Sequence, residues 1–287
     1  MTLPAVKEYI ISSLSAIYDE HEALAIANTL LSHVLSDAVH HSFDNITPSS
    51  LDPIHIEKIE QAVSRLLLHE PLQYVLEEAW FYNIPFYVNK YVLIPRPETE
   101  ELVELIINSQ FARHQTSFSI LDIGTGSGCI PIVLKKQFPL ATVLGLDVSD
   151  DALKVAQHNA QKNGAEIEFI KADILNPEQL NLQPLDIIVS NPPYITESEK
   201  GEMHANVLEH EPHLALFVTS DNPLQFYETI TLFSATHLKR GGQLYFEVNT
   251  SYSKEIKSFM EENGFTEVLI VKDMQGKDRM ITGSKYR

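Results

Sequence analysis

The sequence predicts an α/β protein in which a small α-helical unit precedes a larger domain built on a mostly parallel β-sheet. Up to about residue 70, apolar side chains recur at helical spacing. From Glu98 onward, strand-like and helix-like segments alternate, which is typical of a parallel sheet covered by helices on both faces. A chain of 287 residues is long enough for such a domain, of about 180 residues, with a smaller companion.

Residues 1–72 are predicted to form a helical-bundle domain. The segment HEALAIANTLLSHVL carries an apolar stripe at spacings of three and four, the period of one helix face, formed by Leu24, Ala27, Leu31 and Val34. Asp52 and Pro53 provide an N-cap and a first-turn proline for a further helix. The predicted apolar face of that helix consists of Ile56, Ile59, Val63, Leu66 and Leu67. We interpret both stripes as the core of the bundle.

A linker is predicted over residues 73–97. The stretch from PLQYVLEEAW to FYVNKYVLIPRPETE is aromatic and β-branched, with prolines at 85, 95 and 97. This composition indicates a β-hairpin followed by a rigid turn. We expect the hairpin to connect the helical domain to a larger domain that spans residues 98–287.

The larger domain is predicted to contain seven strands. The candidates are SILDIG (119–124), TVLGLDV (142–148), IEFIKAD (167–173), LDIIVS (185–190), QLYFEV (243–248), EVLIVKD (267–273) and RMITG (279–283). Helix candidates lie between most of these strands, and one such helix begins at Ser149 or Asp150 and ends at Gly164. Only MQGKD joins the last two strands, too short for a helical crossover, so these two strands must be antiparallel. A mixed sheet of this kind, Rossmann-like with an antiparallel seventh strand, is the arrangement of class I S-adenosylmethionine-dependent methyltransferases.

A glycine-rich loop follows the first strand, in LDIGTGSGCI. It comprises Gly124, Thr125, Gly126, Ser127 and Gly128. Ligands of open α/β sheets bind where such a loop turns into a helix, and glycine lets the backbone approach them closely. The loop lacks the lysine of a P-loop, and Cys129 stands where a dinucleotide fingerprint would have Gly or Ala. The phosphate-cradling interpretations are therefore weakened.

Acidic residues end the next two strands. Asp147 lies about 20 residues beyond the glycine loop, where it can accept hydrogen bonds from a ribose diol. Dehydrogenases and methyltransferases both use such an acid, so Asp147 alone does not separate them. Asp173 could accept from an adenine amino group, with Ile174 packing on the ring, or could cap the following turn.

The fourth strand runs into Asn191, Pro192, Pro193 and Tyr194. Pro192 forces Asn191 into an extended conformation, and two fixed φ angles stiffen the turn. The Asn191 oxygen and the Pro192 carbonyl could each accept one hydrogen of a planar NH2 group, on which Tyr194 could stack. This arrangement is suited to methylating a conjugated nitrogen. Glu98 and Thr99, in IPRPETE, could approach a cofactor or cap the helix that follows.

The composition restricts the class of partner. Net charge is −18, which disfavours a phosphate backbone and makes a stable nucleic-acid partner unexpected. The single cysteine excludes an internal disulfide and a multi-cysteine zinc site, and the histidines His204, His210 and His213 lack the acid or Cys pair that would complete a metal site. No apolar run approaches a membrane helix. We expect a cytoplasmic protein, without a metal or a membrane partner.

Together these residues make the chain similar to the HemK/PrmC family, the N5-glutamine methyltransferases of peptide chain release factors. The motifs that carry the resemblance are PLQYVL, FYNIPFYVN, VLIPRPETEELVE, LDIGTGSGCI, GLDVSDDAL, IIVSNPPYI, HEPHLAL, GGQLYFEV and KDMQGKDRMI. The resemblance implies that the glycine loop, Asp147, Ile174 and Asn191 contact S-adenosylmethionine. It also implies that Asn191 to Tyr194 hold the glutamine of a Gly-Gly-Gln motif, and that the helical domain helps to dock the release factor. We expect the enzyme to be a monomer.

Three positions depart from the family pattern, since Glu77, Asn83 and Asn249 stand where glycine is usual. They lie in the linker hairpin and after the fifth strand. Two alternatives to the family activity remain. One is another amide or amine acceptor, either a ribosomal-protein glutamine or a nucleic-acid base. The other is a module that binds a cofactor without catalysis, or a dehydrogenase.

Overall fold

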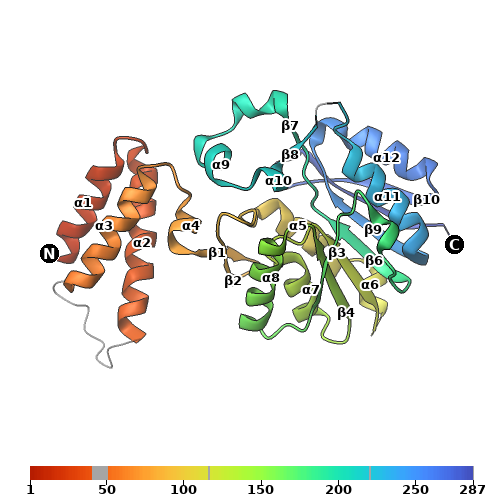
Figure 1. The fold of residues 1–287 in the computed structure, drawn as a ribbon, viewed down its shortest axis with the longest axis horizontal. Helices are drawn as coiled ribbons and strands as arrows, with labels where there is room; N and C mark the ends of the chain where they lie inside the picture. Colours follow the sequence, from red (N-terminus) through yellow and green to blue (C-terminus); the bar gives the residue numbers. More distant parts are fainter. Residues whose placement is uncertain (41–50, 116, 220, 287) are drawn as a thin grey trace. The chain divides into compact units, whose positions relative to one another are not determined.

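The computed structural model describes residues 1–40, 51–115, 117–219 and 221–286 (Figure 1). The chain divides into two compact units, one formed by Met1–Glu78 with His204–His210 and the other by Ala79–Met203 with Glu211–Arg287. The segment His204–His210 thus belongs to the first unit, although it lies inside the range that we predicted as the larger domain. The boundaries at residues 72 and 97 stay a prediction.

The first unit is a helical bundle. Its helices are α1 (Leu3–Leu14), α2 (Glu20–His40), α3 (Pro53–Leu66), α4 (Leu72–Leu76) and α9 (Ala205–His210). Most of the predicted stripe residues pack into one core, because Ala27, Leu31, Val34, Ile59, Val63 and Leu66 are buried. Val6, Ile10 and Leu30, which the predicted stripes did not include, belong to the same core. Leu24 and Leu67 were wrongly included, because each is 38% exposed. Pro53 begins α3, but the Asp52 side chain makes no capping hydrogen bond.

The predicted hairpin consists of β1 (Glu78–Phe81) and β2 (Ile84–Tyr87), which form a two-stranded sheet. Tyr82 and Asn83 between them have φ angles of +51° and +58°, as the central residues of a type I′ turn require. Glu77, just before β1, also has a positive φ, of +54°. Glycine relieves strain in this conformation, which explains physically why Glu77 and Asn83 occupy glycine-favouring positions.

The larger sheet has the seven predicted strands. They are β3 (Ser119–Ile123), β4 (Thr142–Asp147), β5 (Glu168–Lys171), β6 (Leu185–Ser190), β9 (Leu238–Glu247), β10 (Phe265–Lys272) and β11 (Asp278–Lys285). Their spatial order is β10-β11-β9-β6-β3-β4-β5. Neighbours from β9 to β5 are parallel, whereas β11 is antiparallel to both β9 and β10. The antiparallel pairing deduced from the short MQGKD connection is therefore confirmed.

Helices cover both faces of this sheet (Figure 1). Alternate strand residues point to opposite faces, so Ile120 belongs to one buried cluster and Leu121 to the other. The first cluster includes residues of α5 (Pro97–Ile107), α6 (Gln110–His114), α7 (Cys129–Gln137) and α8 (Asp150–Lys162). The second includes residues of α11 (Gln225–His237) and α12 (Ser253–Glu262). The remaining elements are α10 (His213–Leu216), the parallel pair β7 (Ile195–Thr196) and β8 (Phe217–Val218), and the 3-10 helices Pro177–Gln179, Glu197–Glu202 and Thr250–Tyr252.

None of the helices in the described part of the chain combines the length and the apolar character needed to cross a membrane.

Candidate active site

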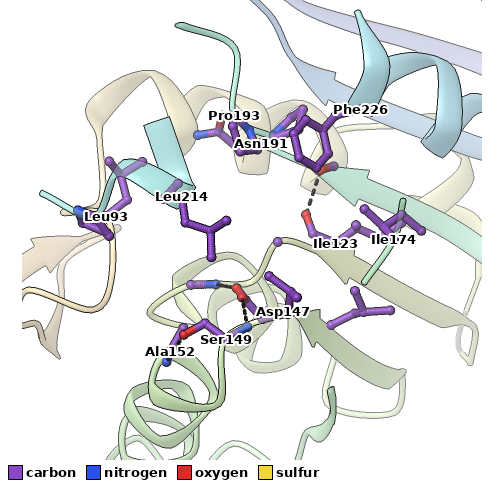
Figure 2. A pocket seen from close by; sticks show the side chains of 18 of the residues that line it. Leu93, Ile123, Asp147, Ser149, Ala152, Ile174, Asn191, Pro193, Leu214 and Phe226 are labelled. Carbon is purple, nitrogen blue, oxygen red and sulfur yellow. Dashed lines mark hydrogen bonds between the residues drawn. The ribbon is translucent and has the colours of Figure 1, made fainter. Parts of the chain in front are cut away.

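A cavity of about 330 Å³ opens at the carboxyl ends of β3, β4 and β6 (Figure 2). The strand order places β3 between β4 and β6, so the chain leaves β3 toward one side of the sheet and later returns on the other. Ligands of open α/β sheets bind at such a switch point. The volume lies within the range of small-molecule sites.

The glycine loop forms the floor of this cavity with its backbone. Gly124 and Gly126 line the cavity, with φ angles of +77° and +52°. A Cβ added at Gly124 would meet only the Asn191 carbonyl, 4.0 Å away, and one at Gly126 only the Gly124 carbonyl, also at 4.0 Å. The side chains that glycine omits would therefore fill open space, which leaves room for a ligand against the backbone.

The other residues of the loop serve the fold. Gly128 has a φ of +80°, and a Cβ there would lie 3.2 Å from the Cβ of Ala156 on α8. Thr125 and Ser127 have buried side chains. None of these three residues is among those that line the cavity, so their predicted contact with a cofactor stays a prediction.

Asp147 connects the end of β4 to the glycine loop. Its Oδ2 accepts a hydrogen bond from the Gly126 N–H at 2.9 Å, and its Oδ1 accepts one from the Ser149 N–H at 2.9 Å. Burial raises the pKa of Asp147, and the N–H donors act against this increase. Each carboxylate oxygen keeps a second lone pair, so Asp147 can still accept from two hydroxyl groups. It lines the cavity, on a different side from Asn191 in this view (Figure 2).

Asp173 and Ile174 line the cavity beyond β5. The Asp173 side chain also accepts hydrogen bonds from the Leu175 N–H at 2.9 Å and from Nδ2 of Asn176 at 2.7 Å. It therefore caps the turn while facing the cavity, and the two roles considered from the sequence do not exclude each other. Ile174 is 6% exposed and contributes an apolar wall.

The Asn-Pro-Pro-Tyr stretch contributes three of its four residues to the cavity. Asn191, Pro192 and Pro193 line it, and Figure 2 shows Asn191 and Pro193 near Phe226. Ser190 fastens the stretch to β3, since its hydroxyl donates to the Ile123 carbonyl at 2.7 Å.

Tyr194 is not among the residues that line the cavity. The hydroxyl donates to Oε1 of Glu247 over a long 3.4 Å, and burial raises the pKa of the phenol. The backbone carbonyl of Tyr194 accepts from Nδ2 of Asn249 at 3.3 Å.

The residues just before the IPRPETE motif line the cavity, whereas Glu98 and Thr99 within the motif do not. Thr99 is 3% exposed and donates its hydroxyl proton to Oε2 of Glu247 at 2.6 Å, while Glu98 is half-buried in the first turn of α5. The preceding residues Lys90 to Leu93 form the cavity wall instead.

An ion pair secures that wall. Glu211 has a side chain that is 1% exposed, and it pairs closely with Arg96. Its Oε2 also accepts from the Ile94 N–H at 3.2 Å. Glu211 thus holds the end of the Lys90–Leu93 wall against the start of a second wall, formed by Pro212, Leu214 and Ala215.

Phe226 and Leu214 were missed as site residues from the sequence. Leu214 belongs to HEPHLAL, which the family resemblance quoted without giving it a role. Phe226 lies in the first turn of α11 and has no motif around it. Leu214 and Phe226 reach the cavity only through the three-dimensional fold, which no local sequence pattern indicates.

The histidines have other partners. His210 bonds through Nε2 to the Leu68 carbonyl at 2.9 Å, and His213 packs edge-on against Phe217 with ring centroids 5.1 Å apart. Among the described residues, no group of three or more His, Cys, Asp or Glu side chains is arranged to hold a metal ion.

Comparison with known proteins gives concordant matches. A family model described as a methyltransferase small domain matches residues 103–215. The release factor glutamine methyltransferase of Flavobacterium psychrophilum is 45% identical over 98% of this chain and 98% of its own, and that of Bacteroides thetaiotaomicron is 40% identical over 98% and 99%. A solved methyltransferase structure from Pyrococcus furiosus, 16% identical, superposes with a TM-score of 0.53 over 79% of this chain and 100% of its own, and this likeness supports the fold alone.

Proposed function

Because the chain belongs to the release factor glutamine methyltransferase family, we propose that its cavity holds S-adenosylmethionine and presents the methyl group to a glutamine side chain of a release factor. The enzyme is an S-adenosylmethionine-dependent protein methyltransferase with the class I fold. We take the acceptor to be the amide nitrogen of the glutamine in a Gly-Gly-Gln motif, in keeping with the family resemblance.

The residues at the glycine-loop side of the cavity suit the cofactor. Gly124 and Gly126 leave space against the backbone, and the two free lone pairs of Asp147 suit the ribose hydroxyls. We assign Asp173 and Ile174, which line the same cavity, to the adenine. When bound, S-adenosylmethionine supplies a methyl group activated by a positively charged sulfur.

The residues at the Asn-Pro-Pro-Tyr side suit the acceptor. An amide nitrogen is a poor nucleophile because its lone pair is delocalised into the carbonyl. Acceptance of its two hydrogens by Oδ1 of Asn191 and the carbonyl of Pro192 would hold the group in one orientation, with the nitrogen directed at the methyl carbon. Bound S-adenosylmethionine would supply the methyl group with its sulfonium sulfur as the leaving group, and the methylated nitrogen would lose one proton to water. No base is needed beforehand, because the nitrogen becomes acidic only after it is methylated.

The observation that supports this proposal most strongly is that Asn191 and Pro192 line the same cavity as Gly126 and Asp147. The groups proposed for the acceptor and for the cofactor therefore share one cavity. The two prolines restrict the backbone conformation at Asn191 and in the turn that follows it.

The direct test is transfer of a labelled methyl group to a purified release factor. The same factor with its glutamine replaced, a ribosomal protein and DNA serve as competing acceptors. We expect label only on the intact release factor. Label on DNA, or label that ignores the glutamine, would overturn the proposed acceptor.

Asn191→Ala tests the assigned roles within the site. We expect it to abolish turnover and to leave most of the cofactor affinity, because it removes an acceptor for the reacting amide. Wild-type turnover in this variant would show that the tetrapeptide does not hold the substrate.

The remaining proposals concern the setting of the reaction. We propose that the helical unit docks the release factor, that the enzyme works in the cytoplasm where its substrate acts, and that it is a monomer. Light scattering after size-exclusion chromatography measures the last point directly, and a dimer mass would contradict it.

A further inference from the structure

A chain of hydrogen bonds runs from the buried end of β9 to the cavity. Oγ1 of Thr99 donates to Oε2 of Glu247 at 2.6 Å, and Nδ2 of Asn191 donates to the same Oγ1 at 3.1 Å. Glu247 is 1% exposed and Thr99 is 3% exposed, so water does not compete for these bonds. The three residues come from β9, from α5 and from the end of β6, and only Asn191 reaches the cavity.

The direction of each bond follows from the donors and acceptors available. An ionised carboxylate can only accept, and a threonine hydroxyl has a single proton to donate. Thr99 therefore donates that proton to Glu247 and can only accept from Asn191. The group that Asn191 turns toward Thr99 must then be its NH2 group, so its Oδ1 must point the other way.

This constraint matters because an amide side chain has nearly the same shape in either orientation. Sterics alone would allow Asn191 to present its NH2 group to the cavity. That group would oppose the N–H hydrogens of a glutamine substrate, donor against donor. Only the oxygen can accept one of them.

We propose that Glu247 and Thr99 are positioning residues that fix the side-chain oxygen of Asn191 as the acceptor for the substrate amide. This inference rests on the proposed role of Asn191 in holding the glutamine. Neither Glu247 nor Thr99 touches the substrate, and their effect reaches it through the Asn191 amide alone.

The charge on Glu247 is what makes it an obligate acceptor. Burial raises its pKa to about 7, and the hydrogen bond from Thr99 and the charge of Arg279 on β11 act against this increase. The other groups that face it are Glu98 on α5, whose charge raises the pKa, and the hydroxyls of Tyr194 and Tyr227. Once protonated, Glu247 can itself donate, and the direction of the chain is no longer imposed. Turnover should therefore fall as the pH drops through about 7.

The experiment compares Thr99→Val with Thr99→Ser and Glu247→Gln. Valine keeps the shape and removes the hydroxyl, whereas serine keeps the hydroxyl. We expect Thr99→Val to lower kcat for methyl transfer to the release factor by about tenfold, the effect of losing one orienting hydrogen bond, and Thr99→Ser to stay within about twofold of wild type. Calorimetry should give all of the variants a cofactor affinity close to that of wild type, because Thr99 and Glu247 do not line the cavity and Asn191 is unchanged.

A pH profile at saturating cofactor separates this role from a merely structural one. Wild-type kcat should decline on the acid side of about 7, and Glu247→Gln should lower kcat at high pH and remove that decline. Wild-type kcat in Thr99→Val, or in Glu247→Gln at high pH, would overturn the inference. The cofactor affinity of each variant shows that it is folded, and Thr99→Ser shows whether the hydroxyl alone restores kcat.

Asn191→Ala separates the proposed role of Asn191 from the positioning role of Thr99 and Glu247. If it is inactive while Thr99→Val is fully active, the positioning chain is wrong and the proposed role of Asn191 survives. If Asn191→Ala is active, the proposed role itself is wrong.

Discussion

Replacing Asp147 with asparagine is the sharpest test of the cofactor side of the cavity. The substitution preserves shape and removes one acceptor oxygen together with the charge. Both oxygens of Asp147 already accept a backbone N–H at 2.9 Å, from Gly126 and from Ser149. An asparagine NH2 group would face one of those donors and could accept nothing from a ribose hydroxyl.

The magnitude follows from the bonds that are lost. A hydrogen bond to a charged group contributes about 1.5–3 kcal/mol, so loss of one ribose bond should weaken cofactor binding about 10- to 100-fold. Replacement of Asp147 with alanine removes both oxygens and should weaken binding further. At saturating cofactor kcat should change little, because the role that we propose for Asp147 is to bind the ribose and not the acceptor.

Isothermal titration calorimetry with S-adenosylmethionine measures the effect. Asp151→Asn is the matched control, since it makes the same change of charge on α8 at a side chain that is 47% exposed and paired with Lys154. We expect the control to bind like wild type. An Asp147→Asn variant with unchanged affinity would refute the assignment of Asp147 to the ribose.

Three further predictions concern stability. Gly128→Ala should lower the free energy of unfolding by about 2–4 kcal/mol, because the strain of the left-handed backbone adds to the close contact of the new Cβ with α8. Gly276→Ala should show the strain alone, because its φ is +84° and no atom lies within 4 Å of the added Cβ. Equal losses of stability in denaturant titrations would show that the contact with α8 contributes nothing. Burial raises the pKa of Asp122 to about 7, so its stabilising contribution is complete below the unfolded pKa and is lost as the pH rises through about 7. Wild-type stability should therefore fall across that window, with Glu247 contributing in the same sense, and Asp122→Asn should flatten part of the fall; an unchanged slope would contradict this. Glu211→Gln should cost about 1.5–3 kcal/mol through the buried ion pair behind the cavity wall, and an unaltered denaturation midpoint would show that the pair contributes nothing.

The sheet could be predicted from the sequence because its signal is local. Each strand is a short apolar run bounded by turn residues, and the antiparallel end follows from the length of MQGKD alone. The helical unit was harder to predict in detail, because α2 is apolar on more than one narrow stripe. Leu24 fits the helical period and is nevertheless exposed, while Ala23 and Leu30 are buried.

Some residues of the candidate site could also be predicted from the sequence, and others could not. The glycine loop and Asn-Pro-Pro-Tyr can be recognised by their composition, and the structure brings both to one cavity. The partner of Thr99 could not be predicted, because Glu247 lies 148 positions away and a lone glutamate at the end of a strand carries no signal.

The sequence marked Asn249 as a departure from the family pattern, but the structure shows no strain there. Its φ of −67° needs no glycine, so the departure from the family pattern leaves the backbone unstrained and adds hydrogen bonds to Tyr194 and Glu199.

The chemistry of the acceptor explains why the cavity orients the reacting amide while contacts outside the cavity provide the affinity for the release factor. A glutamine amide is uncharged and has no ring, so the reacting group itself offers little binding energy. Tight binding of the release factor must therefore come from contacts outside the cavity, whereas the buried chain from Glu247 to Asn191 acts on orientation alone. Changes on the helical unit, which we propose docks the release factor, should accordingly raise KM at unchanged kcat, and changes in the buried chain should lower kcat. A chain with net charge −18 is suited to a protein acceptor, because its charge disfavours a phosphate backbone.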